Sequence, residues 1–119
     1  MKLVLSWIAG SEIFLLLITL IAISGCADKL GTVNQAINSH IYSKEYNCKN
    51  FAEDKYKELL KQGYKDENMR FIITDYKGEP HVVLNVNGWI LDNMRDKPYP
   101  ATKNLQAGLS YHYWRAFRG

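Results

Sequence analysis

Three residues whose types can cooperate in nucleophilic catalysis follow one another along the chain: Cys48, His81 and Asp92. A cysteine attacks a carbonyl carbon as its thiolate, so it needs a base that holds the thiol proton and a third group that orients the base. Histidine and aspartate are suited to these two roles. The residue types therefore predict a Cys-His-Asp triad, provided that the fold brings the three side chains together.

Cys48 stands at the expected start of a helix over residues 47–62. Asn47 is a favourable N-cap, and Gly63 follows as a C-terminal stop. Charged residues, Lys55 among them, are expected on the outer face. The expected buried stripe consists of Phe51, Ala52, Tyr56, Leu59 and Leu60. Cys48 falls on the apolar side of the first turn, where free N–H groups and the helix dipole lower the pKa of a thiol.

His81 and Asp92 belong to an expected antiparallel meander whose strands cover residues 69–76, 81–86 and 89–93. The Asn87-Gly88 pair is a strong signal for a two-residue hairpin turn. In that register His81 and Asp92 are diagonal neighbours on one face, about 7–8 Å apart at the backbone. A slip of one residue would separate them and would bury Asn85 among apolar side chains. The expected core face carries Val82, Leu84, Val86, Trp89 and Leu91.

Two other histidines are rival bases, namely His40 in the upstream segment and His112 in the aromatic tail. Neither has a carboxylate at a defined spacing. A zinc site formed by Cys48 and the histidines is also disfavoured, because no pair has the spacing of zinc ligands. His81 therefore remains the favoured base.

Four short segments carry a resemblance to a known family. Val33-Asn34 and Ile37-Asn38 are similar to its V-N-x-x-[VI]-N helix, and residues 46–52, YNCKNFA, to its G-D-C-E-D-Y-A box. Residues 81–84, HVVL, resemble its H-A-V-L strand, and residues 89–93, WILDN, its I-L-D-N strand. In this order the segments resemble the bacterial transglutaminase-like cysteine peptidases, the family of the LapG-type periplasmic adhesin protease. The similarity covers about residues 33–115.

The resemblance implies an α+β fold with a papain/transglutaminase-like core, in which N-terminal helices pack on a small antiparallel β-meander. It also implies a triad of Cys48, His81 and Asp92 that cleaves an amide bond in a periplasmic or envelope protein. Two alternatives remain open. The chain could be an inactive surface lipoprotein that acts as a binding module, or an acyltransferase of the same fold.

The chain departs from the family's pattern around the cysteine. The family's acidic residues there are associated with calcium, but this chain has Asn47 and Lys49, and only Asn50 keeps a polar oxygen. Calcium prefers negatively charged oxygen ligands, so the lysine argues against it. We therefore expect no metal and no cofactor. The segment between Tyr42 and Tyr46 is also shorter than in the family, so substrate selection does not carry over.

Residues 13–26, IFLLLITLIAISGC, form an apolar run that ends in small residues, as in secretory signals. Their last four residues resemble a bacterial lipobox, in which the cysteine, here Cys26, is lipidated. An uncleaved anchor over residues 3–23 is the alternative. Both predict a periplasmic or extracytoplasmic, membrane-anchored protein.

The expected domain organisation is a signal segment over residues 1–26, a linker over 27–32 and a peptidase-like domain over 33–119. A first helix is expected over 32–42. Lipidation of Cys26 would leave Cys48 as the one remaining thiol, whereas a disulfide between them is the less favoured alternative.

The overall charge adds little about partners. The chain of 119 residues has a formal net charge of +3, which is too small to argue for nucleic acid. The segment 95–119 is more basic and rich in aromatic residues, as in surfaces that contact membranes or anionic partners. The expected partners are a protein or peptide substrate in the cell envelope and the membrane itself.

Overall fold

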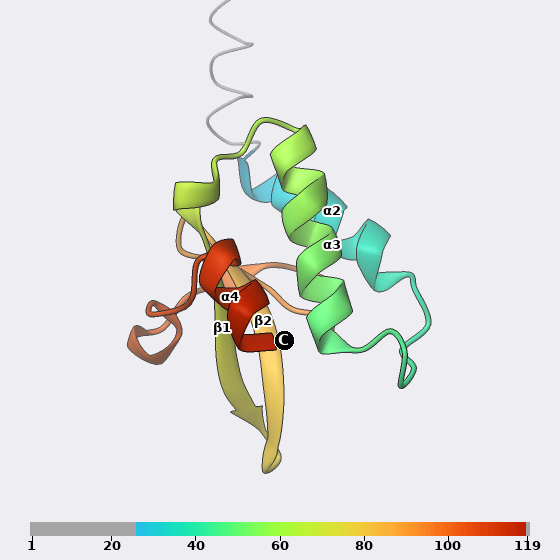
Figure 1. Cartoon of the computed structure of the whole chain (residues 1–119). Helices are drawn as coiled ribbons and strands as arrows, with labels where there is room; N and C mark the ends of the chain where they lie inside the picture. Colours follow the sequence, from blue (N-terminus) through green and yellow to red (C-terminus); the bar gives the residue numbers. More distant parts are fainter. Residues whose placement is uncertain (1–25, 119) are drawn as a thin grey trace, which may run out of the picture.

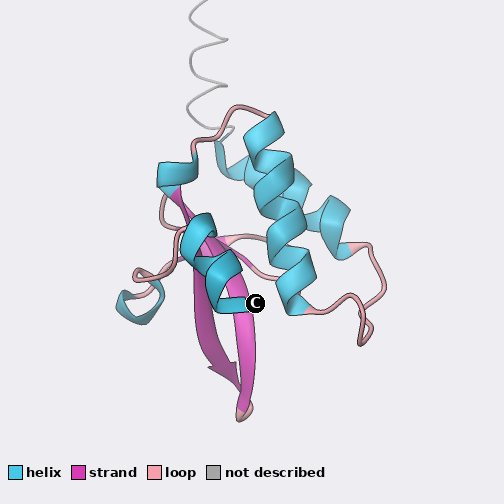
Figure 2. Cartoon of the chain, viewed as in Figure 1, coloured by secondary structure: helices cyan, strands magenta, loops and turns pink. Residues whose placement is uncertain are grey.

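The computed structural model describes residues 26–118, which contain three α-helices and a four-stranded antiparallel sheet (Figure 2). The expected α+β class is confirmed. The expected signal segment, apart from Cys26, lies outside the described residues. The helices are α2 (Cys26–Asn38), α3 (Cys48–Lys61) and α4 (Tyr111–Arg118). The strands are β1 (Met69–Tyr76), β2 (Glu79–Val86), β3 (Trp89–Leu91) and β4 (Tyr99–Pro100), in the order β1-β2-β3-β4.

Helix α3 begins and ends as the sequence predicts. The Asn47 side chain caps its first turn, and Asn50 closes a reciprocal capping box by bonding the Asn47 backbone. Gly63, at a φ of 97°, follows the last turn. Two positions on its faces were predicted wrongly: Leu60 is 40% exposed, whereas Lys55 is 1% exposed. Lys55 lies four residues from both Phe51 and Leu59, so the helical period places it in the middle of the buried stripe.

Helix α2 corrects the expected linker and first helix. It begins at Cys26 and ends at Asn38, so residues 27–32 are helical and residues 39–42 are not. The physical reason is packing, because Leu30 and Val33 are both buried in the core formed by the helices and the sheet. Ile41, which falls within the expected helix over 32–42, lies outside α2 and is 87% exposed.

The hairpin register is confirmed. Val86 pairs with Trp89, and Leu84 with Leu91, across the Asn87-Gly88 turn. Both turn residues have positive φ, 52° for Asn87 and 89° for Gly88, as a type I′ turn requires. Strand β3 is shorter than predicted, because it ends at Leu91. A second two-residue turn, Lys77-Gly78, joins β1 to β2.

Both faces of the sheet are covered. Helices α2 and α3 lie side by side, α3 packs against β2, and α4 packs against β1 (Figure 1). The main core lies on this face. Its buried residues are Leu30, Val33, Ala52, Tyr56, Leu59, Met69, Phe71, Val82, Leu84, Val86, Leu91 and Trp114. On the opposite face, Ile72, Val83 and Ile90 pack against the segment that follows β4. The face that carries His81 and Asp92 therefore has a small core of its own.

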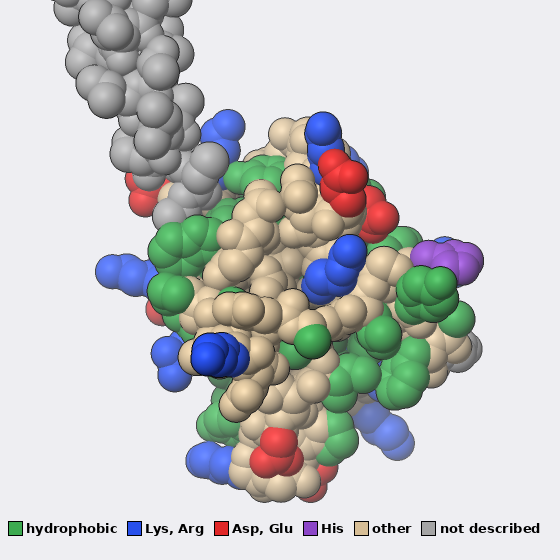
Figure 3. Space-filling model, turned by 90° about the vertical axis from the view of Figure 1, so that its left-hand side faces the viewer, with side chains coloured by type: hydrophobic (Ala, Val, Ile, Leu, Met, Phe, Trp, Pro, Cys, Tyr) green, Lys and Arg blue, Asp and Glu red, His purple; other side chains and the backbone are tan. Residues whose placement is uncertain are grey.

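The C-terminal tail forms elements that the sequence did not predict, namely β4 and α4. Helix α4 buries Trp114, whereas Tyr113 and Phe117 are 65% and 68% exposed. On the face shown in Figure 3, the Lys and Arg side chains lie apart from one another instead of forming one patch. Within residues 26–118, none of the helices has both the length and the apolar character needed to cross a bilayer.

The Asn87-Gly88 turn yields a testable prediction about the hairpin. Gly88→Ala should lower the free energy of unfolding by about 1–2 kcal/mol, because an alanine is strained at positive φ. Urea unfolding measures the change. Gly31→Ala is the matched control, and it should raise the free energy of unfolding. Its added methyl meets only Pro98 at 3.6 Å, and alanine in a helix is favoured by about 1 kcal/mol over glycine. Equal effects of the two substitutions would contradict the prediction.

Candidate active site

The structure brings Cys48, His81 and Asp92 together. His81 Nε2 lies 2.8 Å from Asp92 Oδ1, and the thiol of Cys48 is hydrogen-bonded to the His81 side chain. The residues come from three elements: the first residue of α3, the third residue of β2 and the first residue after β3. His81 and Asp92 are buried, with 8% and 7% of their surfaces exposed, and Cys48 is half-buried.

The short β3 explains how the thiol reaches the sheet. Leu84 pairs with Leu91, the last residue of β3, so β3 provides no partner for Val82. In an antiparallel ladder alternate residues direct their N–H groups to the same side, so Val82 directs its amide to the side left open. The Val82 N–H is hydrogen-bonded to the Cys48 sulfur. The end of β3 thus leaves room for the start of α3.

The environment of Cys48 favours a thiolate. Burial raises the pKa of the thiol, but hydrogen bonds from His81 and from the backbone of Val82 and Lys49, together with the His81 charge, lower it below 9.0. Cys48 is also the first residue of a helix of 14 residues, where the dipole favours negative charge. A depressed thiol pKa at a half-exposed position is the condition for a nucleophilic cysteine.

His81 is held in its charged form by both neighbours. The hydrogen bond to Asp92 and then the hydrogen bond to Cys48 raise its pKa from 6.5 to about 9, against the opposing effect of burial. An imidazolium at neutral pH donates one N–H to the carboxylate and the other to the thiolate. His81 is therefore positioned to donate a proton to a group that reacts at the Cys48 sulfur.

Asp92 is held by more partners than the sequence indicated. Burial raises its pKa, but hydrogen bonds from His81, the Met94 backbone and the Tyr99 hydroxyl, together with the His81 charge, keep it below 3.8. The Met94 N–H lies 2.9 Å from Asp92 Oδ1, which is an Asx turn, and Tyr99 donates to Oδ2 at 3.0 Å. Tyr99 was not anticipated, because no sequence pattern predicted the return of β4 to this edge.

Lys55 is the second unanticipated group. Its ammonium lies 5.9 Å from the centre of the Phe51 ring, and among the described residues it forms no ion pair within 4.0 Å. Burial lowers its pKa from 10.5 to about 7, and the charge of Asp92 opposes this effect. The helical period of α3 predicts that this lysine faces the core, whereas its charge favours the exposed face.

The positions at which the family carries acidic residues have a different role in this chain. The Asn47 carboxamide accepts a hydrogen bond from the Lys49 N–H at 3.1 Å, and Asn50 bonds the Asn47 backbone at 3.1 Å. These side chains cap α3. Among residues 26–118, no three His, Cys, Asp or Glu side chains are grouped as a metal site would require.

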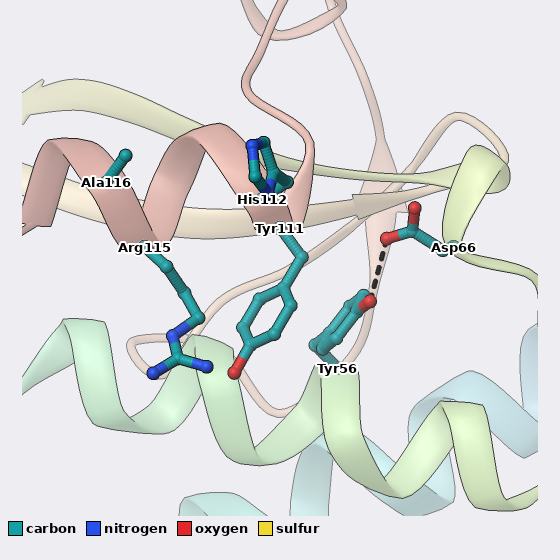
Figure 4. A pocket seen from close by; sticks show the side chains of 6 residues that line it. All are labelled: Tyr56, Asp66, Tyr111, His112, Arg115 and Ala116. Carbon is teal, nitrogen blue, oxygen red and sulfur yellow. Dashed lines mark hydrogen bonds between the residues drawn. The ribbon is translucent and has the colours of Figure 1, made fainter.

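The rival histidines lie elsewhere. The ring of His40 stacks on Tyr46 with centroids 4.7 Å apart. His112 lines a pocket of about 500 Å³ between α3 and α4, where Tyr56 donates to Asp66 at 2.7 Å (Figure 4). Cys48 does not line this pocket, and the histidine that lowers the pKa of the Cys48 thiol is His81.

A cleft of about 340 Å³ opens onto the His81–Asp92 pair from the side of β1. Arg95 stacks on Tyr99 at its wall, with 4.6 Å between the guanidinium and the ring centre. Cys48 is not among its lining residues. The cleft therefore reaches His81 and Asp92 but not Cys48.

Comparison with protein-family models, with curated proteins and with solved structures finds no match to this chain.

The His81–Asp92 bond yields a prediction for the titration of His81. A folded-state pKa raised to about 9 stabilises the protein fully below pH 6.5, and this contribution is lost as the pH rises to about 9. Asp92→Asn removes the carboxylate charge, so the His81 pKa should fall toward 6.5. NMR titration of the imidazole measures it. Asp75→Asn, which neutralises another carboxylate of the cleft that His81 and Asp92 line, should leave the pKa of His81 unchanged.

The buried lysine yields a prediction for stability. Between about pH 7 and 10.5 Lys55 binds more protons in the unfolded state than in the folded state, so its own contribution to stability becomes less unfavourable as the pH rises through this window. Lys55→Met removes the buried charge and should stabilise the protein by about 2 kcal/mol below that window. Urea unfolding at several pH values should show this gain shrinking as the pH rises. A gain that does not depend on pH would refute the explanation.

Proposed function

We propose that this chain is an exported cysteine peptidase-like thiol hydrolase with a papain/transglutaminase-like core. The observation that carries the proposal is that His81 is hydrogen-bonded to the Cys48 thiol on one side and to the Asp92 carboxylate on the other. A nucleophile, a base and an orienting group linked in this order are the requirements of acyl transfer through a covalent intermediate. The family resemblance of the cysteine box and of the two strands supports the same function.

The proposed reaction proceeds in two steps. The Cys48 thiolate attacks the carbonyl carbon of an amide and forms a carbon–sulfur bond, while the His81 imidazolium donates its proton to the leaving nitrogen. The carbon–nitrogen bond breaks, the amine leaves, and an acyl thioester remains on Cys48. A water molecule, deprotonated by His81, then attacks the thioester, the carbon–sulfur bond breaks, and the carboxylic acid leaves while the Cys48 thiolate and the His81 imidazolium are restored. Asp92 keeps the imidazole in the orientation needed in both steps.

The first turn of α3 offers a donor for the oxyanion that forms in each step. The Asn47 side chain accepts hydrogen bonds from the backbone N–H groups of Lys49 and Asn50. The Cys48 N–H, at the very start of the helix, has no carbonyl partner within it. We propose that this N–H stabilises the developing negative charge, as backbone amides do in oxyanion holes.

The proposed substrate is a protein or peptide of the cell envelope, and the proposed location is the periplasmic or extracytoplasmic side of a membrane. Lipidation of Cys26 would hold the domain there. Acyl transfer to an amine instead of water requires the same residues, so it is distinguished by adding an amine acceptor and identifying the product. The binding-module alternative is distinguished by the reactivity of Cys48.

The reactivity of the thiol tests the proposal. Iodoacetamide should alkylate Cys48 at neutral pH faster than it alkylates free cysteine, because the thiolate is stabilised by His81. In His81→Ala the rate should fall about tenfold or more, since each pKa unit changes the thiolate fraction about tenfold near neutral pH. Mass spectrometry of the peptide that carries Cys48 separates this signal from Cys26.

His112→Ala is the matched control, because this histidine lines a pocket that does not contain Cys48. Its labelling rate should equal that of the wild type. A rate no faster than that of free cysteine, unchanged in His81→Ala, would exclude the enzyme and favour the binding module. If Cys48 is reactive, comparing envelope protein fragments between wild type and Cys48→Ala identifies the substrate.

A further inference from the structure

Two asparagines of α2 bind the backbone of the loop that follows β3. Asn38 Nδ2 donates to the carbonyl oxygens of Asp92 and Arg95, each at 3.0 Å. Asn34 Nδ2 donates to the carbonyl oxygens of Arg95 at 2.7 Å and Asp96 at 2.9 Å. The two side chains are four residues apart and so lie on the same face of the helix. Together they form an asparagine clamp on residues 92–96.

The clamp is a built arrangement and not a chance surface contact. Asn34 is 0% exposed, so its amide is shielded from water. Each carboxamide uses both of its N–H donors on backbone oxygens, which also identifies the nitrogen, because a flipped amide would face oxygen with oxygen. Loss of the Asn38 amide would leave the Asp92 carbonyl oxygen with only the 3.3 Å hydrogen bond from the Arg95 N–H, and loss of the Asn34 amide would remove the donor to the Asp96 carbonyl oxygen.

The clamped loop is the part of the chain that carries the orienting carboxylate. Strand β3 ends at Leu91, so the sheet does not fix the backbone of Asp92. Within the loop, the Arg95 N–H lies 3.3 Å from the Asp92 carbonyl oxygen, which is a long hydrogen bond. Asn38 binds the same carbonyl oxygen at 3.0 Å from outside the loop. The position of the Asp92 side chain therefore depends on a contact with α2.

We propose that Asn34 and Asn38 are positioning residues that hold Asp92 against His81, an inference that rests on the proposed Cys-His-Asp function. Asn38 acts on the Asp92 backbone directly, and Asn34 acts through the Arg95 and Asp96 carbonyl groups of the same loop. Helix α2 thereby becomes part of the candidate site, although it contributes no group to the chemistry. Its placement on the sheet determines whether the carboxylate meets the imidazole.

The test replaces one clamp residue and reads the effect at His81. Asn38→Leu has a similar size but no amide donor. The pKa of His81 should fall from about 9 toward 6.5, and the His81 Nε2–H signal in NMR should broaden or vanish. Alkylation of Cys48 at neutral pH should slow about tenfold, the effect of losing one hydrogen bond of a charged group. Gln35→Leu is the control, because this amide lies on the exposed side of the same helix.

The outcomes separate positioning from simple structural support. A lower melting temperature with an unchanged His81 titration in Asn38→Leu would overturn the proposal, because the asparagines would then only attach α2 to the sheet. If Asn38→Leu does not fold, Asn38→Ser, which is smaller and also lacks the amide, is measured in the same way.

The two hypotheses fail in different ways. If Cys48 of the wild type is unreactive, but the His81 Nε2–H signal is present and is lost in Asn38→Leu, the clamp stands and the proposed hydrolase function fails. If that signal persists in Asn38→Leu, the clamp fails whatever the reactivity of Cys48. The NMR readout requires neither a substrate nor catalysis.

Discussion

The hydrogen bond between His81 and Asp92 is the contact on which the candidate site depends, and a two-residue turn makes it possible. The Asn87-Gly88 turn fixes which residues of β2 and β3 are opposite one another, and the alternation of side chains along a strand then places both residues on one face. The same alternation directs Val82, Leu84 and Val86 of β2 to the main core. Burial of the core and assembly of the pair therefore follow from one register.

The site contains three charged groups in sequence, and burial of any one of them alone would be unfavourable. A buried carboxylate, an imidazolium and a thiolate each lose hydration, but each is next to a group of opposite charge or a backbone dipole. The charge of the imidazolium favours the ionised form of both neighbours. Lys55 stands apart from these groups, because burial lowers its pKa more strongly than the charge of Asp92 raises it. A buried lysine of this kind is an expected cost to stability rather than a source of it.

The small size of the domain determines how the site is supported. The helices cover one face of the sheet, while a short C-terminal segment covers the other and delivers the Tyr99 hydroxyl to Asp92. Strand β3, only three residues long, leaves β2 open where α3 begins. Cys48, His81 and Asp92 thus meet where the regular sheet ends. Because the hydrogen-bond ladder of the sheet ends here, side chains and helix caps must hold the backbone around the site.

Much of this arrangement could be predicted from local patterns. The Asn47 cap, the Gly63 stop and the Asn87-Gly88 turn act over a few residues, and each was correctly predicted. The diagonal relation of His81 and Asp92 follows from such a turn by geometry alone. The burial of Lys55 also had a local signal, the helical period of α3, but its charge argued for the outside.

What the sequence by itself determined was therefore the identity of the three candidate site residues, the start of the helix that carries the cysteine and the register of the hairpin. Only the tertiary structure decided that α2 begins at Cys26, that β4 returns Tyr99 to Asp92 and that the α2 asparagines bind the loop after β3. These contacts join residues far apart in the chain, such as Asn38 and Asp92. No local pattern encodes them, because they exist only once the helices and the sheet have packed together.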